Sequence, residues 1–181
     1  DLHLYTLGYP NREVKIGFTQ GLLAQYKNRK MTGSGFVAQF FVAMYRHDID
    51  KALTLLQSFL AGIPYDLENK TEKHFQTIIY LIFSLLGYYT RAEVKSAAGR
   101  ADAVCWTKDR IYVFEFKLDG SADQALRQID DKGYLIPFRF DSTQDGNAAQ
   151  SSRELVKVGV NISSQTRTID TWKVEETGCP V

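Results

Sequence analysis

The sequence has few cysteines, histidines and prolines, and it lacks a long apolar run. Its 181 residues include two cysteines, three histidines and four prolines. Two cysteines, Cys105 and Cys179, cannot form a disulfide framework, which favours a reducing, cytoplasmic compartment. The longest apolar stretch, residues 78–89, is shorter than the ~20 residues that cross a bilayer, and no signal peptide is visible. We therefore expect neither a disulfide-rich secreted protein nor a membrane protein.

An excess of charge of one sign is also missing. The 22 Lys and Arg residues nearly balance the 21 Asp and Glu residues, which leaves a net charge of +1 and excludes a polycationic nucleic-acid binder. The sequence holds no Walker-type glycine loop and no recognisable Ser-His-Asp arrangement. What it does contain, 44% hydrophobic and 13% aromatic residues, is enough for a folded core. Because the chain begins at Asp1 rather than Met, we expect it to be part of a longer protein.

Apolar residues spaced by three and four predict helices in the first half of the chain. These helices cover residues 19–30, 36–46, 49–62 and 72–86, with a glycine-serine break, read as a linker, at residues 33–35. Asp48 is the expected cap of the third helix, and Gly62 is its expected end. The pattern then changes to strands over residues 88–95, 101–106 and 111–117, with a polar turn at 107–110.

The remaining residues complete an α/β pattern. Ser121 is expected to cap a helix that runs to about Lys132, and strands follow over residues 155–162 and 168–175. Residues 134–140 fit either an edge strand or an irregular loop, because Pro137 lies among aromatic residues. From residue 66 the order is α-β-β-β-α-β-β, which predicts a mixed central sheet flanked by helices. We divide the chain into a helical linker or collar over residues 1–65 and a second domain over residues 66–181.

The strand over residues 111–117 carries two charged residues in an otherwise apolar segment. At the start of this strand, apolar residues lie on both faces, so the strand should be buried on both sides. Glu115 and Lys117 are two residues apart and therefore point to the same face. A carboxylate and an ammonium group near a core need pairing or a metal ion to offset their desolvation.

Folding the hairpin about its polar turn places Asp102 directly opposite Glu115. Residues opposed in this way have Cβ atoms ~4.5–5.5 Å apart, so two like charges would repel each other. A divalent cation between them would remove the repulsion, and hard carboxylate ligands favour Mg²⁺ or Mn²⁺ over zinc. Two carboxylates and a lysine beside one metal ion suit the hydrolysis of phosphodiesters. The alternative is a salt-bridged strand end at the surface.

These residues are part of a longer pattern. The segment Gly99-Arg100-Ala101-Asp102, followed by Glu115-Phe116-Lys117 and then Ala125-Leu126-Arg127-Gln128-Ile129, resembles the PD-(D/E)XK nuclease superfamily. It is similar to the bacterial subgroup in which this domain follows an AAA-ATPase-like domain, and residues 9–14 resemble the segment that joins the two. The resemblance implies a restriction-endonuclease-like core with α-β-β-β-α-β order, preceded by a helical N-terminal segment.

The resemblance also implies roles for individual residues. Asp102 and Glu115 would bind the metal ion, with the Phe116 carbonyl as a third ligand and Glu72, on the first core helix, as a further one. Lys117 would be the catalytic lysine, and Gln128 matches a glutamine that contacts water or phosphate. Because the gap from Gln128 to Tyr134 is longer than in the exonuclease-like branch, we expect no site role for Tyr134.

Two further residues are expected to meet the substrate. Arg100 can bind a phosphate or pair with a nearby acid, and Gln124 shares a helix face with Gln128. The expected activity is Mg²⁺-dependent hydrolysis of nucleic acid, with DNA as the expected substrate, within a protein that also carries an ATPase-like domain. The alternative is a catalytically silent nuclease-like module that binds or regulates that ATPase. Metal binding and cleavage would distinguish the two.

Overall fold

The computed structural model describes residues 33–63, 72–85, 90–96, 99–138 and 153–177, together with Asn11, Glu13, Val14 and Gly17. The predicted helix over residues 19–30, the residues 141–152, which we expect to form a polar loop, and Cys179 lie outside the described residues. The side chain of Glu72 lies outside them as well.

A five-stranded sheet forms the centre of the molecule. Its strands are β1 (Thr90–Ser96), β2 (Gly99–Trp106), β3 (Arg110–Leu118), β4 (Glu154–Ser163) and β5 (Thr168–Thr177). They lie side by side in chain order; β3 and β4 are parallel, and the other neighbours are antiparallel. The prediction of a mixed sheet is confirmed. Strand β3 is buried over six consecutive residues, as expected for a strand that is covered on both faces.

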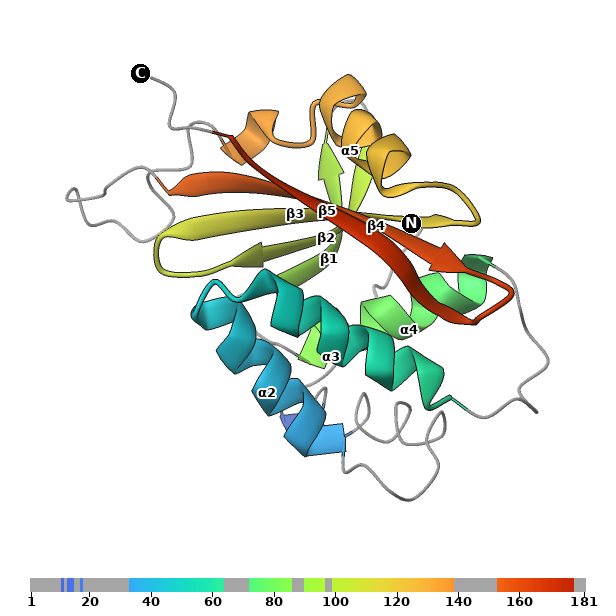
Figure 1. Cartoon of the computed structure of the whole chain (residues 1–181). Helices are drawn as coiled ribbons and strands as arrows, with labels where there is room; N and C mark the ends of the chain where they lie inside the picture. The colour runs from blue at the N-terminus through green and yellow to red at the C-terminus, as the bar shows by residue number, and fades with distance from the viewer. Residues whose placement is uncertain are drawn as a thin grey trace, which may run out of the picture.

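Helices cover both faces of this sheet. Figure 1 shows α2 (Gly33–Tyr45), α3 (Ile49–Ala61) and α4 (Glu72–Leu85) below the sheet and α5 (Ala122–Asp131) above it. From α4 onward the described elements follow the order α4-β1-β2-β3-α5-β4-β5. Between α5 and β4, the segment that the sequence left undecided contains a short 3-10 helix, Ile136–Phe138. Within the described part of this segment, residues 134–138, the chain is therefore not an edge strand.

The helix ends follow the predicted capping residues in two cases and depart from prediction in a third. Asp48 accepts a hydrogen bond from the Lys51 N–H (3.1 Å), and Ser121 accepts one from the Gln124 N–H (3.1 Å). The expectation of a linker at residues 33–35 is wrong, because these residues form the first turn of α2. The buried Phe36 and Phe40 hold this helix against α3 and α4, and such packing outweighs the low helix propensity of glycine.

The larger of two apolar cores joins the N-terminal helices to the sheet. The Phe40 ring on α2 lies 5.7 Å from that of Phe83 on α4, which lies 5.1 Å from that of Phe114 on β3. Helices α2, α3 and α4 thus share one core with the sheet. The division into a linker over residues 1–65 and a domain over residues 66–181 stays a prediction.

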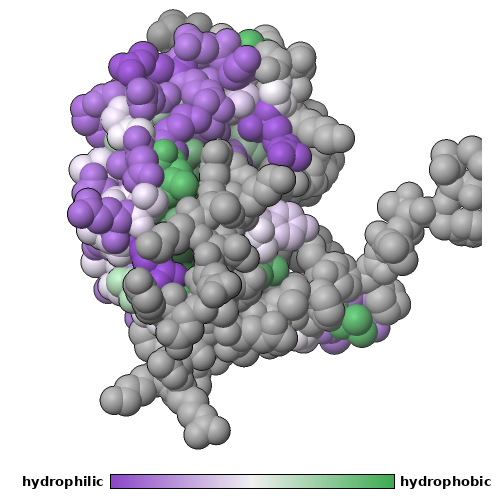
Figure 2. Space-filling model, turned by 90° about the vertical axis from the view of Figure 1, so that its right-hand side faces the viewer, coloured by the Kyte–Doolittle hydropathy of each residue, from purple (hydrophilic) through white to green (hydrophobic). Residues whose placement is uncertain are grey.

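The smaller core lies between the sheet and α5. It contains Val104, Val113, Leu126 and Ile129. Figure 2 shows hydrophilic side chains gathered over the upper part of the molecule, the side on which Figure 1 places α5. Within the described part of the chain, no helix has the length and apolar character needed to cross a membrane. The cytoplasmic location stays a prediction.

Candidate active site

The register of the β2–β3 hairpin places two carboxylates beside each other. The paired residues run from Trp106 and Ile111 to Ala103 and Phe114, which confirms the predicted register over this part of the hairpin. The pairing ends there, one step before Asp102 and Glu115. In place of a further ladder bond, the Asp102 carboxylate accepts a hydrogen bond from the Phe116 N–H (2.9 Å). The predicted direct opposition is thus replaced by a bond that holds Asp102 against the backbone of β3.

Glu115 lies at the centre of a small polar group on the α5 side of the sheet. Its side chain is almost fully buried, and the residue is 3% exposed. One carboxylate oxygen, Oε1, accepts hydrogen bonds from Lys117 Nζ (3.0 Å) and from Gln128 Nε2. Lys117 Nζ also donates to Gln128 Oε1. We call Asp102, Glu115, Lys117 and Gln128 the carboxylate–lysine cluster.

The buried location of Glu115 changes its acidity. Burial, followed by the negative charge of Asp102, raises the pKa of Glu115 from its ordinary 4.5 to about 7, against the opposing effect of the hydrogen bond and charge of Lys117. The ammonium group of Lys117 therefore does not fully offset the burial of this carboxylate beside Asp102. A raised pKa in a carboxylate with a defined charge partner is typical of functional sites.

The second oxygen of Glu115 fits a cation. Of the buried side-chain oxygens and nitrogens in the described residues, Glu115 Oε2 has no hydrogen-bond partner. Such an atom is costly in a protein interior unless water or an ion satisfies it. The described side chains include no group of three or more His, Cys, Asp or Glu residues that could hold a metal ion together. Mg²⁺ is commonly held by one or two carboxylates, with waters and substrate phosphates completing its shell, so Asp102 and Glu115 fit this ion.

The other predicted site residues lie at the margin of the cluster or outside the description. Arg100 and Gln124 are both exposed, on β2 and α5 respectively, and Gln124 lies one helical turn before Gln128. Glu72 is the first residue of α4, and its role as a ligand stays a prediction. The Phe116 carbonyl likewise stays a predicted ligand, while the N–H of the same residue fixes Asp102.

Tyr134 lies closer to the cluster than the sequence predicted. Its hydroxyl is 3.3 Å from Gln128 Nε2, and its ring is buried. The aromatic ring also lies against Gly99, where a Cβ atom would be 3.1 Å from the hydroxyl. The chain reverses between Gln128 and Tyr134 through Gly133, which has a φ of +58°. In the sequence, Gly133 was the signal that could have indicated this turn and so placed Tyr134 close to the helix.

Two residues of β4 shape the cluster without contributing a charge to it. In the parallel register, Gly159 lies beside Glu115 and Asn161 lies beside Lys117. A Cβ atom at Gly159 would lie 2.4 Å from the Ala122 carbonyl oxygen, so only glycine allows α5 to approach this closely. Asn161 is buried and accepts a hydrogen bond from the Gly120 N–H (2.9 Å). Neither residue was predicted from the sequence, although a glycine within a strand indicates a close approach of another backbone.

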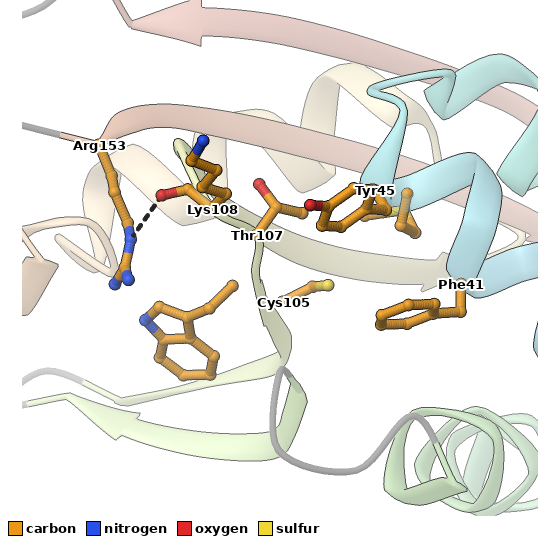
Figure 3. Close-up of a pocket in the computed structure, with 8 residues that line it drawn as sticks. Phe41, Tyr45, Cys105, Thr107, Lys108 and Arg153 are labelled. Carbon is orange, nitrogen blue, oxygen red and sulfur yellow. Dashed lines mark hydrogen bonds between the residues drawn. The ribbon is translucent and has the colours of Figure 1, made fainter. Parts of the chain in front are cut away.

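A pocket of about 250 Å³ lies at the other end of β2. Figure 3 shows Phe41 and Tyr45 from α2 on one side of it and Arg153, which donates to the Lys108 carbonyl, on the other. Cys105 also lines this pocket. Burial raises the pKa of Cys105 to about 12, which keeps it a thiol rather than a nucleophilic thiolate. The pocket contains no member of the carboxylate–lysine cluster, and we place the candidate active site at the cluster.

Comparison with known proteins agrees with this geometry. The chain is 29% identical over 181 residues to a protein of Azotobacter chroococcum mcd 1 named "Uncharacterized protein in vnfD 5'region", and the match covers 96% of the chain but 33% of that relative. The chain therefore spans about a third of the length of this relative. No solved structure matches the chain. A family model described as the PD-(D/E)XK nuclease superfamily matches residues 70–172, which include the whole cluster. The chain belongs to the PD-(D/E)XK nuclease superfamily.

Proposed function

We propose that this domain is a Mg²⁺-dependent nuclease that hydrolyses the phosphodiester bonds of DNA, with Mn²⁺ as an effective substitute. One observation carries the proposal: the Glu115 carboxylate is buried beside Asp102, one oxygen is bonded to Lys117 and Gln128, and the other is without a partner. Membership of the superfamily supports phosphodiester hydrolysis in general terms. The metal ion is our inference from the chemistry of the site, and DNA is the substrate that we infer from the resemblance to the nuclease superfamily.

The proposed mechanism assigns a separate task to each cluster residue. Asp102 and Glu115 would hold the metal ion, which, when bound, would polarise a phosphoryl oxygen and lower the pKa of a water molecule. Lys117 directs the attacking water and offsets negative charge that develops on the phosphoryl oxygens. Gln128 bonds to both Lys117 and Glu115, so it holds the ammonium group in place. Attack of water on phosphorus then breaks the bond from phosphorus to the leaving oxygen.

Exposed basic residues on β2, on α5 and at the C-terminal end of α5 support a polyanionic substrate. Arg100, Arg127 and Lys132 are exposed, and we propose that Arg100 contacts a phosphate of the backbone. Gln124 is exposed one turn before Gln128, where we propose that it contacts the same strand of nucleic acid. Hydrogen bonds to phosphates position a nucleic acid without reading its sequence. We therefore expect little sequence preference from these contacts.

We further propose that the domain acts within a larger, ATPase-linked protein. The resemblance of the motif to the AAA-ATPase-associated subgroup supports this, and the match to one third of the Azotobacter relative is compatible with additional domains. ATP hydrolysis by the full-length protein would test the linkage. If that protein hydrolyses no ATP, with or without DNA, the ATPase linkage is wrong while the nuclease proposal still stands.

The decisive experiment is a cleavage assay with matched variants. End-labelled single- and double-stranded DNA and RNA are incubated with Mg²⁺, Mn²⁺ or EDTA and the wild-type, Glu115→Gln or Lys117→Met protein. Lys157→Met is the matched control, because Lys157 is likewise a lysine on the α5 side of the sheet, where it is buried and pairs with Asp130 (2.9 Å) and Glu175 (2.6 Å). We expect metal-dependent cleavage of DNA that both cluster variants lose and the folded control keeps. Absence of cleavage in every condition, or undiminished cleavage by both cluster variants, would contradict the proposal.

A further inference from the structure

The turn that joins β3 to α5 is attached to the end of β4 by three hydrogen bonds. The Asp119 N–H donates to the Ile162 carbonyl oxygen (2.8 Å), and the Ser164 N–H donates to Asp119 Oδ1 (2.8 Å). The Gly120 N–H donates to Asn161 Oδ1 (2.9 Å). Both residues of the turn are thus bound to residues 161–164, which follow one another in the chain. We call this arrangement the β4 clamp.

The backbone of Asp119 shows why the turn needs external support. Its φ is +52°, in the left-handed region, which is uncommon for residues other than glycine. Aspartate and asparagine tolerate this region better than other side chains, since their short polar groups can bond locally. Hydrogen bonds from Ser164 lower the pKa of Asp119, so the carboxylate is the form that accepts the bond. The strained turn is therefore stabilised by the end of β4.

The same part of β4 also sets how closely α5 approaches the sheet. Asn161 is 6% exposed, lies beside Lys117 in the register and is, with Lys157, one of two buried polar residues of β4. Two residues earlier, Gly159 leaves the space that α5 occupies. Gly159 therefore sets the distance of α5 from the sheet. Asn161 and Asp119 fix the position at which α5 begins.

The position of α5 decides the geometry of the cluster. Gln128 lies on α5, whereas Glu115 and Lys117, which it contacts, lie on β3. A change in the turn between these two elements would move Gln128 relative to Lys117. We propose that Asp119 and Asn161 are positioning residues of the nuclease site, which hold the β3–α5 turn so that Gln128 keeps the Lys117 ammonium group oriented. This inference rests on the proposed nuclease function.

The test compares variants that break the clamp with one that preserves it. Asn161→Ala removes the acceptor for Gly120, and Asp119→Gly removes the acceptor for Ser164 while relieving the left-handed backbone. Asp119→Asn keeps an oxygen acceptor and tolerates the same φ. Gln57→Ala is the matched control, because it removes one hydrogen bond of 2.8 Å, to the Ile169 carbonyl, that α3 makes to β5 on the opposite side of the sheet.

We expect kcat to fall about 10- to 100-fold in Asn161→Ala and Asp119→Gly, as is usual for small misplacements of reacting groups. Mn²⁺ affinity, measured by calorimetry, should be unchanged, since Asp102 and Glu115 are retained on β2 and β3. Asp119→Asn should restore kcat. Wild-type kcat in both clamp variants, an equal loss in Gln57→Ala, or failure of Asp119→Asn to restore activity would overturn the inference.

A second measurement separates the clamp from the proposed activity. Amide hydrogen exchange in residues 122–131 reports the anchoring of α5 without any substrate. We expect faster exchange there in Asn161→Ala and Asp119→Gly than in Gln57→Ala, and equal exchange in all three would overturn the clamp. If the wild-type protein cleaves nothing, the proposed function fails, and the exchange rates alone decide whether the clamp exists.

Discussion

Replacement of Glu115 by glutamine should stabilise the metal-free protein at neutral and alkaline pH while it abolishes activity. The substitution keeps the shape of the side chain and an oxygen that accepts from Lys117 and Gln128. It removes the buried negative charge that lies beside Asp102 and is only partly offset by Lys117. Stability and function should therefore change in opposite directions at this position, as they do where a functional group is held in an unfavourable environment.

The pH dependence and its size follow from the pKa of Glu115. Because the pKa rises from 4.5 to about 7 on folding, the folded protein between these values holds a proton that the unfolded chain has released. The stability of the wild-type protein should then fall as the pH rises through this window. At ~1.4 kcal/mol per pKa unit, the full cost is about 3 kcal/mol, and it is complete above pH 7. Glutamine carries no such cost.

The assay is urea unfolding in EDTA, followed by the fluorescence of Trp106 and Trp172, from pH 5 to pH 8.5. The free energy of unfolding of Glu115→Gln minus that of the wild type should increase by about 2 to 3 kcal/mol over this range. Glu175→Gln, which replaces an exposed carboxylate, should keep the pH dependence of the wild type. A difference between Glu115→Gln and the wild type that is constant with pH, or that decreases, would refute the reasoning.

Four other substitutions or deletions test separate parts of the structure. Lys117→Met should lower kcat by about 10²- to 10³-fold and leave Mn²⁺ binding in calorimetry intact; loss of metal binding would instead make Lys117 a structural partner of Glu115. Gly159→Ala should destabilise the fold by about 1–3 kcal/mol in urea unfolding, since a Cβ atom would lie 2.4 Å from the Ala122 carbonyl oxygen; wild-type stability would show that α5 is free to move away. Tyr134→Phe should cost about 1 kcal/mol of unfolding free energy and lower kcat modestly through Gln128, and an unchanged kcat with unchanged stability would argue against the contact. Deletion of residues 1–65 should produce a protein that binds a hydrophobic dye and unfolds without cooperativity, because α2 and α3 share the core of the sheet. Cooperative unfolding of the shortened protein would instead support the predicted boundary at residue 65.

The hairpin that carries Asp102 and Glu115 shows how far the sequence alone can predict a site. The polar turn and the alternation of apolar residues predicted the register correctly down to Ala103 and Phe114. The prediction was incomplete at Asp102, where a side chain takes the Phe116 N–H in place of a ladder bond. Ideal pairing assumes that backbone groups bond to each other, and a short acidic side chain can compete for the same donor.

The uncharged residues of the candidate site were harder to predict from the sequence than the charged ones. Glu115 and Lys117 were recognisable because charged groups in a buried strand need a partner or a metal ion to offset their desolvation. Gly159 and Asn161 act only through the packing of α5 and the turn before it, and this packing depends on contacts between segments far apart in the chain. The same holds for residues 33–35, where contacts of α2 with α3 and α4 outweigh the local preference of glycine and serine for a break.

The charges of the cluster connect its instability to the proposed reaction. Two carboxylates and one ammonium group leave a net charge of about −1 when Glu115 is ionised, and burial together with the charge of Asp102 raises the pKa of Glu115. A divalent cation would bring the sum to about +1, the charge that complements a phosphodiester group. Without a cation, the site therefore disfavours the ionised form of Glu115 and repels the substrate. Once a cation is bound, the site favours the ionised form of Glu115 and attracts the substrate. The near-neutral composition of the chain as a whole is compatible with this, because binding of the substrate would depend on the local balance at the cluster rather than on the total charge.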